Sequence, residues 1–358
     1  MEPARQPVAA ARGSAFPAPS DEKARDEASR FITSLYLGIL RREPDAAGLK
    51  QHTESLLAGR THAEIADDFL TSAEFGRQLA AKGLFRPPGH FYSPIVDPVE
   101  AGRHLDAMWA KPLPAQLPAI ALDRSEMVAA WRNLLPFLST VPFLETKRRR
   151  YRFFFDNPTY SWGDGSVLHA MVRRHKPKRL MEIGSGYSSA CTLDTVEHYL
   201  KWNCELTFIE PHAQLLRKIV GKDTDKVRIF EMPVQQIPLS EFDRLQENDI
   251  LFIDSTHVMR TGSDVCFELF EILPRLASGV LVHFHDIFWP FEYGRSWAVD
   301  ENRSWNEAYA VRAFLSHNSA WKIVMFNDYL AKLERDLIEK TFPAFLRNTG
   351  GALWLRRV

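Results

Sequence analysis

The chain has 358 residues, of which 45% are hydrophobic and 25% are charged. This length exceeds what a single hydrophobic core usually holds, so we expect two domains joined by linkers. Lysine plus arginine and aspartate plus glutamate are balanced at 45 each, which gives no electrostatic reason to expect nucleic acid or an anionic membrane as a partner.

The N-terminal segment 1–22 is rich in alanine, proline and arginine. It lacks the apolar run of a secretory signal, and the chain nowhere carries the roughly 18 uninterrupted apolar residues of a membrane helix. The cysteines Cys191, Cys204 and Cys266 lie singly in apolar surroundings, which suits a reducing compartment. We therefore expect a disordered tail over 1–22 and a cytoplasmic protein without a transmembrane segment.

A helical pattern follows over 23–85, where apolar residues recur at helical spacing. Within it, segments 35–36, 41–49 and 70–75 resemble a short helical module of uncharacterised function that occurs in bacterial surface-layer and glycan-modifying proteins. We expect this small all-α domain to support docking to another protein, or a homo-oligomer, rather than chemistry.

Residues 86–124 are dense in proline and predict an extended linker, and residues 125–158 predict a helical bridge. From residue 159 onward, short apolar runs alternate with amphipathic segments, which predicts strands joined by crossover helices. We expect a Rossmann-like, doubly wound α/β sheet of seven strands over 159–358. Its last two strands are expected to form a hairpin-like return. The expected strands are 179–183, 205–209, 227–230, 249–253, 279–284, 321–326 and 352–355.

The turn after the first expected strand, Glu182-Ile183-Gly184-Ser185-Gly186-Tyr187, is the strongest local signal. Glycine lets a backbone turn tightly and approach a ligand where a Cβ atom would collide. A Gly-x-Gly turn alone is weak evidence, and this one lacks the third glycine of the dinucleotide fingerprint. However, Glu210 ends the second expected strand 24 residues after Gly186, close to the spacing of about 20 at which a carboxylate meets the ribose bound at the first turn.

Together these segments resemble the first two motifs of class I S-adenosylmethionine-dependent methyltransferases. The resemblance implies that the two glycines contact S-adenosylmethionine, that Glu182 helps to hold its methionine moiety and that Glu210 accepts both ribose hydroxyls. It also implies that Val234 or Gln235, after the third strand, lies beside the adenine. The full set of implied cofactor-binding residues is Glu182, Gly184, Ser185, Gly186, Tyr187, Glu210, Pro211, Val234, Gln235 and Asp254.

Polar side chains follow the fourth and fifth expected strands. Asp254 and Asp286 come directly after buried strands, so both carboxylates are expected at the edge where open α/β sheets bind ligands. Neighbouring carboxylates repel unless a cation, a proton or a cationic substrate lies between them. His257 and His285 add two imidazoles at this edge, whereas we interpret His283 as a core residue.

Three interpretations of this edge stay open. In the first, Asp254, His285 and Asp286 hold Mg²⁺ or another divalent cation that lowers the pKa of an acceptor hydroxyl. Catechol and macrolide-sugar O-methyltransferases resemble the chain in placing acidic ligands at these two strand ends, although they favour two acidic residues on the fifth. In the second interpretation no metal binds, and His257 or His285 is the general base. In the third, the histidines are structural.

An aromatic cluster follows Asp286 and suits either the apolar face of a sugar ring or a packed core. Over 162–358, the chain is similar to a bacterial subgroup of these methyltransferases that occurs among glycan and secondary-metabolite genes. That similarity implies in-line methyl transfer to a hydroxyl of a carbohydrate, glycoconjugate or secondary metabolite. The aromatic cluster comprises Phe288, Trp289, Phe291, Tyr293, Trp297 and Trp305.

We therefore expect an S-adenosylmethionine-dependent O-methyltransferase acting on a small-molecule or glycan acceptor. The expected catalytic residues are Asp254, His257, His285 and Asp286. Two alternatives stay open: a catalytically idle, cofactor-binding or scaffolding subunit of a glycan-modifying assembly, and a non-haem iron oxygenase using the same histidines and carboxylates. The turn at Gly184 disfavours the oxygenase.

Overall fold

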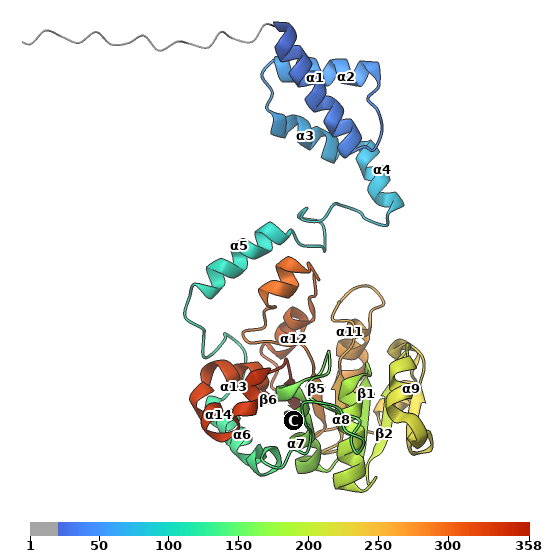
Figure 1. The fold of residues 1–358 in the computed structure, drawn as a ribbon, viewed down its shortest axis with the longest axis vertical. Helices are drawn as coiled ribbons and strands as arrows, with labels where there is room; N and C mark the ends of the chain where they lie inside the picture. Colours follow the sequence, from blue (N-terminus) through green and yellow to red (C-terminus); the bar gives the residue numbers. More distant parts are fainter. Residues whose placement is uncertain (1–20) are drawn as a thin grey trace, which may run out of the picture. The chain divides into compact units, whose positions relative to one another are not determined.

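The computed structural model describes residues 21–358, which fall into two compact units divided after Asp97 (Figure 1). The tail expected over 1–22 lies outside the described residues, except for its last two residues, with which the first helix begins. No helix in the described part of the chain is both long and apolar enough to cross a membrane.

The first unit consists of helices, as expected for the N-terminal module. A small apolar core of Ile32, Tyr36, Leu40, Ile65 and Phe69 holds the helices together. Side chains also satisfy the free N–H groups at the helix starts; for example, Thr61 and Glu64 form a reciprocal capping box. The four helices are α1 (Asp21–Gly38), α2 (Ala46–Leu57), α3 (His62–Thr71) and α4 (Ala73–Ala81).

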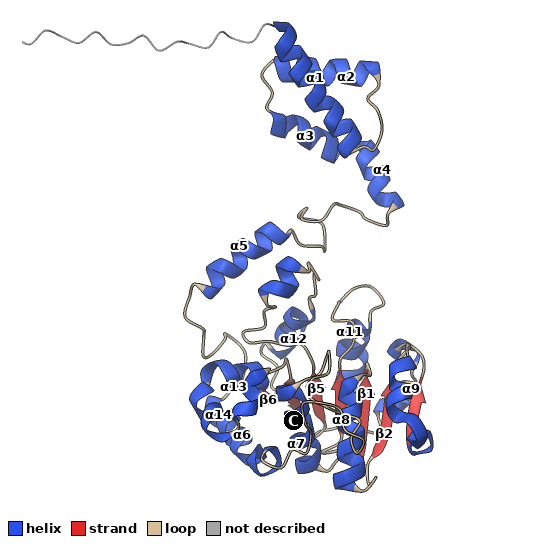
Figure 2. Cartoon of the chain, viewed as in Figure 1, coloured by secondary structure: helices blue, strands red, loops and turns tan. Residues whose placement is uncertain are grey.

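The second unit contains a seven-stranded sheet in the order β3-β2-β1-β4-β5-β7-β6, drawn in red in Figure 2. The first five strands pair in parallel, and β7 runs antiparallel between β5 and β6. This arrangement confirms the expected Rossmann-like sheet with its late return. The strands are β1 (Arg179–Ile183), β2 (Glu205–Ile209), β3 (Val227–Phe230), β4 (Ile250–Ile253), β5 (Leu281–Phe284), β6 (Trp321–Phe326) and β7 (Leu353–Arg357).

Two expectations about the connecting segments differ from the structure. The bridge expected to be helical over 125–158 is helical only as far as Leu138, because residues 139–158 form turns and loops. The segment expected as an extended linker contains the helix α5 (Pro98–Trp109), which begins at a proline. Proline is pre-organised for the first helical position, so it starts this helix rather than preventing it, and Leu105 anchors the helix by burial. The other helices of at least seven residues are α6 (Arg124–Leu138), α7 (Trp162–His175), α8 (Tyr187–Thr195), α9 (Gln214–Val220), α12 (Glu307–Leu315), α13 (Asn327–Leu333) and α14 (Arg335–Thr341).

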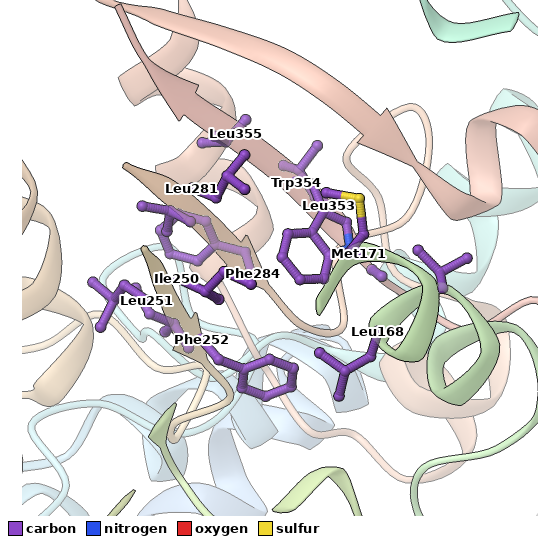
Figure 3. Packing of buried hydrophobic residues seen from close by; sticks show 14 of the residues in the cluster. Leu168, Met171, Ile250, Leu251, Phe252, Leu281, Phe284, Leu353, Trp354 and Leu355 are labelled. Carbon is purple, nitrogen blue, oxygen red and sulfur yellow. The ribbon is translucent and has the colours of Figure 1, made fainter. Parts of the chain in front are cut away.

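The main core lies between the sheet and its covering helices. Figure 3 shows Leu168 and Met171 of α7 packed with side chains of β4, β5 and β7. The residues of β4 and β5 are all buried, as a parallel sheet covered on both faces requires. Within this core His283 stacks on Phe252, with ring centroids 4.1 Å apart. Burial and the nearby His285 lower the pKa of His283 well below its usual value, so it is the neutral core residue expected.

A half-buried arginine, Arg152, connects the segment before α7 to α8. The Arg152 guanidinium lies 2.7 Å from Asp194 and from Glu197, and 2.6 Å from Asp223. The second oxygen of Asp194 accepts the backbone N–H groups of Arg152 and Phe153. The side chains of Asp194 and Asp223 are almost fully buried. Among the described residues Arg152 is the one cation paired with Asp194, whereas Asp223 also lies 3.2 Å from Lys226 Nζ.

Candidate functional site

The glycine turn closes the end of β1 against the end of β4. Gly184 has φ +77°, and a Cβ atom there would lie only 1.8 Å from the carbonyl oxygen of Asp254. Only glycine permits this approach. The backbone N–H of Ser185 donates a 3.0 Å hydrogen bond to Glu210, whose other oxygen accepts the N–H of His212. The turn, Glu210 and Asp254 are therefore neighbours, as the sequence predicts.

Glu182 lies beneath this turn and is fully buried. One of its oxygens accepts 2.7 Å hydrogen bonds from the hydroxyls of Ser188 and Ser189, at the start of α8. Its other oxygen, like the Ser185 hydroxyl, is buried without a hydrogen-bond partner in the described structure. Burial outweighs the two serine hydrogen bonds and raises the pKa of Glu182 to about 8.

Replacing Glu182 with glutamine is expected to flatten the pH dependence of stability between about pH 4.5 and 8. The unfolded carboxyl has a pKa of about 4.3, so its ionisation favours unfolding as the pH rises through this window, by up to ~5 kcal/mol at pH 8. Urea unfolding at pH 5 and pH 8 measures the effect, and Glu301→Gln on the surface is the control. Equal pH dependence in wild type and Glu182→Gln would show that Glu182 is ionised in the folded protein.

The remaining cofactor residues predicted from the resemblance lie around the same edge. Tyr187 begins α8 and packs edge-to-face on Phe154. Val234 is buried after β3, and the Gln235 side chain donates to the carbonyl of Gly262. Pro211 directly follows Glu210. Their contacts with an adenosyl group stay a prediction.

Two carboxylates and a histidine meet where β4 and β5 end. His257 Nε2 lies 3.4 Å from Asp254 and 3.5 Å from Asp286. One ligand atom from each of these three residues lies within 4.8 Å of the others. His257 and Asp286 both have left-handed backbones, at φ 61° and 56°, and such strain is typical of functional sites. The grouping favours His257 over His285 as the third member of the tentative ligand set.

The second histidine of the edge, His285, has both ring nitrogens beside carboxylates. Its Nδ1 lies 3.2 Å from Asp286 and 3.5 Å from Asp254, and its Nε2 lies 3.2 Å from Asp164 at the start of α7. His285 is therefore a bridge between Asp164 and the two strand-end carboxylates, a role that differs from that of His257.

Glu307 and Asp164 are the functional residues that sequence reasoning missed. Glu307 begins α12, is buried, and lies 2.7 Å from His257 Nδ1. Each of these acids stands far along the chain from its histidine, so no local pattern pairs them. A Gly-Gly pair before β7 is a weaker sequence signal that the backbone passes close to the site there. A Cβ on Gly350 would overlap the Asp164 carboxylate, and one on Gly351 would lie 2.7 Å from Asp286 Cα.

The carboxylates of the cluster raise the pKa values of both histidines. Burial opposes the charged form of His257, but hydrogen bonds with Asp254 and Glu307 outweigh it and raise its pKa to about 10. Burial likewise disfavours ionised Asp254, but His285 and His257 prevail and lower its pKa. Three carboxylates raise the pKa of His285 against the effect of burial. The acids therefore favour a positive charge between them, which the imidazoles supply when protonated and which a bound cation would supply in place of the proton on His257 Nε2.

A cavity of about 360 Å³ adjoins the cluster. Asp164, His285 and Asp286 form one part of its wall. Of the aromatic cluster, Trp289, Phe291 and Tyr293 are buried in the core, and Trp305 packs on the His257 ring. The aromatic side chains that line the cavity are Trp109, Phe288 and Trp297.

Comparison with known proteins gives two family matches. Residues 181–287, which span β1 to β5 and include the turn, Glu210 and the strand-end cluster, match a family described as a methyltransferase domain. Residues 19–79 match a domain of unknown function, DUF4214. An uncharacterized protein of Archaeoglobus fulgidus is 27% identical over 171 residues, which cover 47% of this chain and 77% of the relative.

Solved methyltransferase structures share a broad likeness with the chain. The SAH-bound methyltransferase PaMTH1 of Podospora anserina is 15% identical, with a TM-score of 0.35, over 72% of this chain and 96% of its own. The O-methyltransferase TomG of Streptomyces achromogenes, in complex with SAM, is 16% identical, with a TM-score of 0.34, over 72% and 98%. We therefore base the comparison with methyltransferases on the family match over 181–287 and on the strand order of the sheet.

Proposed function

We propose that this chain, whose second unit contains a class I S-adenosylmethionine-dependent methyltransferase domain, methylates a hydroxyl oxygen of a carbohydrate, glycoconjugate or secondary metabolite. The observation that carries the proposal is the contact between the Gly184 turn and Asp254. It joins the expected cofactor turn to a carboxylate–histidine cluster that borders a cavity.

The residues present fit S-adenosylmethionine. The space that a Cβ on Gly186 would occupy is open, and Glu210 lies beside the turn. The buried oxygen of Glu182 and the Ser185 hydroxyl lack partners in the described structure. S-adenosylmethionine supplies a methyl group already activated on a sulfonium, so the protein mainly orients the acceptor, draws off its proton and excludes water.

The strand-end residues also fit a divalent cation. Asp254, His257 and Asp286 would hold it, and two carboxylates with one imidazole suit Mg²⁺ or Mn²⁺. Glu307 binds the other nitrogen of His257, as second partners of metal-bound histidines do. When bound, such a cation lowers the pKa of a hydroxyl that coordinates it.

The chain's own groups place the acceptor. Asp286 belongs both to the cluster and to the cavity wall, so a hydroxyl seated in the cavity lies beside a carboxylate able to take its proton. Trp109, Phe288 and Trp297 offer apolar faces that suit a sugar or phenolic ring and help to keep water out.

The decisive experiment is transfer of labelled methyl to a panel of sugar and phenolic acceptors, with and without chelator. We expect transfer to be lost in EDTA and restored by Mg²⁺ or Mn²⁺. Transfer that is indifferent to chelator would instead favour a histidine base. If no acceptor is labelled although S-adenosylmethionine binds, the proposal gives way to an idle cofactor-binding subunit.

Replacing Glu210 with alanine is expected to weaken S-adenosylmethionine binding by roughly tenfold or more, because a charged hydrogen-bond acceptor is lost. Calorimetric titration measures the change. Glu231→Ala is a matched control, since Glu231 follows β3 as Glu210 follows β2 but pairs with Arg217 on the surface. Equal affinity in wild type and Glu210→Ala would remove Glu210 from the cofactor site.

A further inference from the structure

A second cavity, of about 280 Å³, lies at the opposite edge of the sheet from the catalytic cluster. Residues of α6, the last turn of α7, β6 and β7 line it. Arg356 in its wall pairs with Leu281, the first residue of β5, whereas the catalytic cluster follows the last residue of that strand. The two sites are therefore separated by the length of β5.

Among the charged side chains that line this cavity, cations predominate. Arg174, Lys322 and Arg356 line it together with a single acid, Glu126. Glu126 is already engaged, because Lys322 Nζ lies 2.7 Å from it. Among residues 21–358, no carboxylate lies within 4.0 Å of the Arg174 or Arg356 guanidinium.

Arg356 is held by neutral groups. Its guanidinium donates to the Asn248 side chain and to the carbonyl of Gly279, and it lies 3.4 Å from His175 Nδ1. Burial lowers the pKa of Arg356 against the opposing effect of the Glu247 carboxylate, and the charge on Arg174 lowers it further. Burial, helped by both arginines, lowers the pKa of His175 to about 4. The cavity thus keeps two guanidinium charges, one partly buried, beside a neutral imidazole.

Apart from Asn133, the rest of the lining is apolar. Leu134 of α6, Met171 of α7 and Ile323 and Met325 of β6 contribute to it. Two guanidiniums without a paired carboxylate, beside apolar side chains, are complementary to a ligand with one anionic end, since arginine binds phosphate and carboxylate through paired hydrogen bonds. The volume is near the lower limit of small-molecule sites, which are about 300 Å³ and above.

We propose that this cavity binds a small organic anion, a phosphate or carboxylate on a compact apolar body, through Arg174 and Arg356. The site is independent of the proposed methyl transfer. The anionic end of the ligand contacts Arg174 and Arg356, and its apolar body lies against Leu134 and Met171.

The test is calorimetric titration of the full chain with phenyl phosphate and with inorganic phosphate at constant low ionic strength. We expect both to bind, phenyl phosphate more tightly. Arg356→Gln and Arg174→Gln are each expected to weaken binding roughly tenfold, because each removes a charge-assisted contact. Arg174 is exposed, so its substitution leaves the fold intact.

Arg357→Gln is the matched control, since this neighbouring arginine donates to the carbonyl of Ala320 and lies over Trp321 instead. It is expected to bind both ligands as the wild type does. Failure of the wild type to bind either phosphate, or equal affinity in all three variants, would overturn the proposal. Equal affinity for phenyl phosphate and inorganic phosphate would show that the apolar part of the ligand does not contribute to binding.

Discussion

Alanine at Asp254 is expected to reduce methyl transfer by roughly 10²–10⁴-fold while S-adenosylmethionine still binds, because it removes a carboxylate of the cluster on which proton transfer from the acceptor depends. The carboxylate lies between the imidazoles of His257 and His285, whereas the backbone of the same residue packs on Gly184. Because alanine keeps that backbone contact, the cofactor turn keeps its shape. Single-turnover transfer and calorimetric titration on the same preparation separate the two effects.

Asp254→Asn provides the isosteric control for Asp254→Ala. It keeps the volume and removes the negative charge, so activity as low as in the alanine variant would assign the effect to charge. Glu210→Ala is expected to show the opposite pattern, with weaker cofactor binding. If instead Asp254→Ala abolished cofactor binding and Glu210→Ala abolished only turnover, the roles given to the two carboxylates would be reversed.

Methionine at Arg152 is expected to destabilise the second unit by about 3–5 kcal/mol, the effect of removing one partner from a buried ion pair. Asp194 would stay buried and lose its cation, whereas Asp223 would keep only its contact with Lys226. At roughly 2–4 °C per kcal/mol for a unit of this size, the melting temperature should fall by about 10 °C. Thermal unfolding followed by circular dichroism measures it.

Arg228→Met is the control for Arg152→Met. Arg228 also contacts two acids, Glu205 and Glu241, but its side chain is 37% exposed. Exposed ion pairs contribute about 0–1 kcal/mol, so the melting temperature should change by only a few degrees. Equal loss in both variants would mean that the Arg152 cluster is solvated in solution.

The sheet was predictable because its signals are local. The apolar runs at 179–183, 205–209 and 227–230 match β1, β2 and β3 residue for residue. The expected starts of β4 and β5 were one and two residues early, since Asp249 and Gly279 lie in the turns before these strands. The density of proline at 86–124 led to the prediction of an extended linker, which was wrong over 98–109 because Pro98 begins α5.

The site was predictable only as far as strand ends place residues at one edge. That rule placed Asp254, His257, His285 and Asp286 together, because parallel neighbours end side by side. It gave no information on Glu307 or Asp164, which arrive from helices 50 and 121 residues distant from their histidines. Nor could it tell which histidine joins Asp254 and Asp286 as a possible metal ligand. That depends on contacts with residues distant in the chain, Glu307 at His257 Nδ1 and Asp164 at His285 Nε2.

The position of β7 affects how the protein reaches its folded state during synthesis. β7 comes last in chain order, yet it lies between β5 and β6, and the Gly350–Gly351 turn that leads into it packs on Asp164 and Asp286. A nascent chain still holding these residues inside the ribosome has a gap in its sheet and an unfinished cluster. The sheet and the cluster can therefore be completed only after the Gly350–Gly351 turn and β7 have left the ribosome.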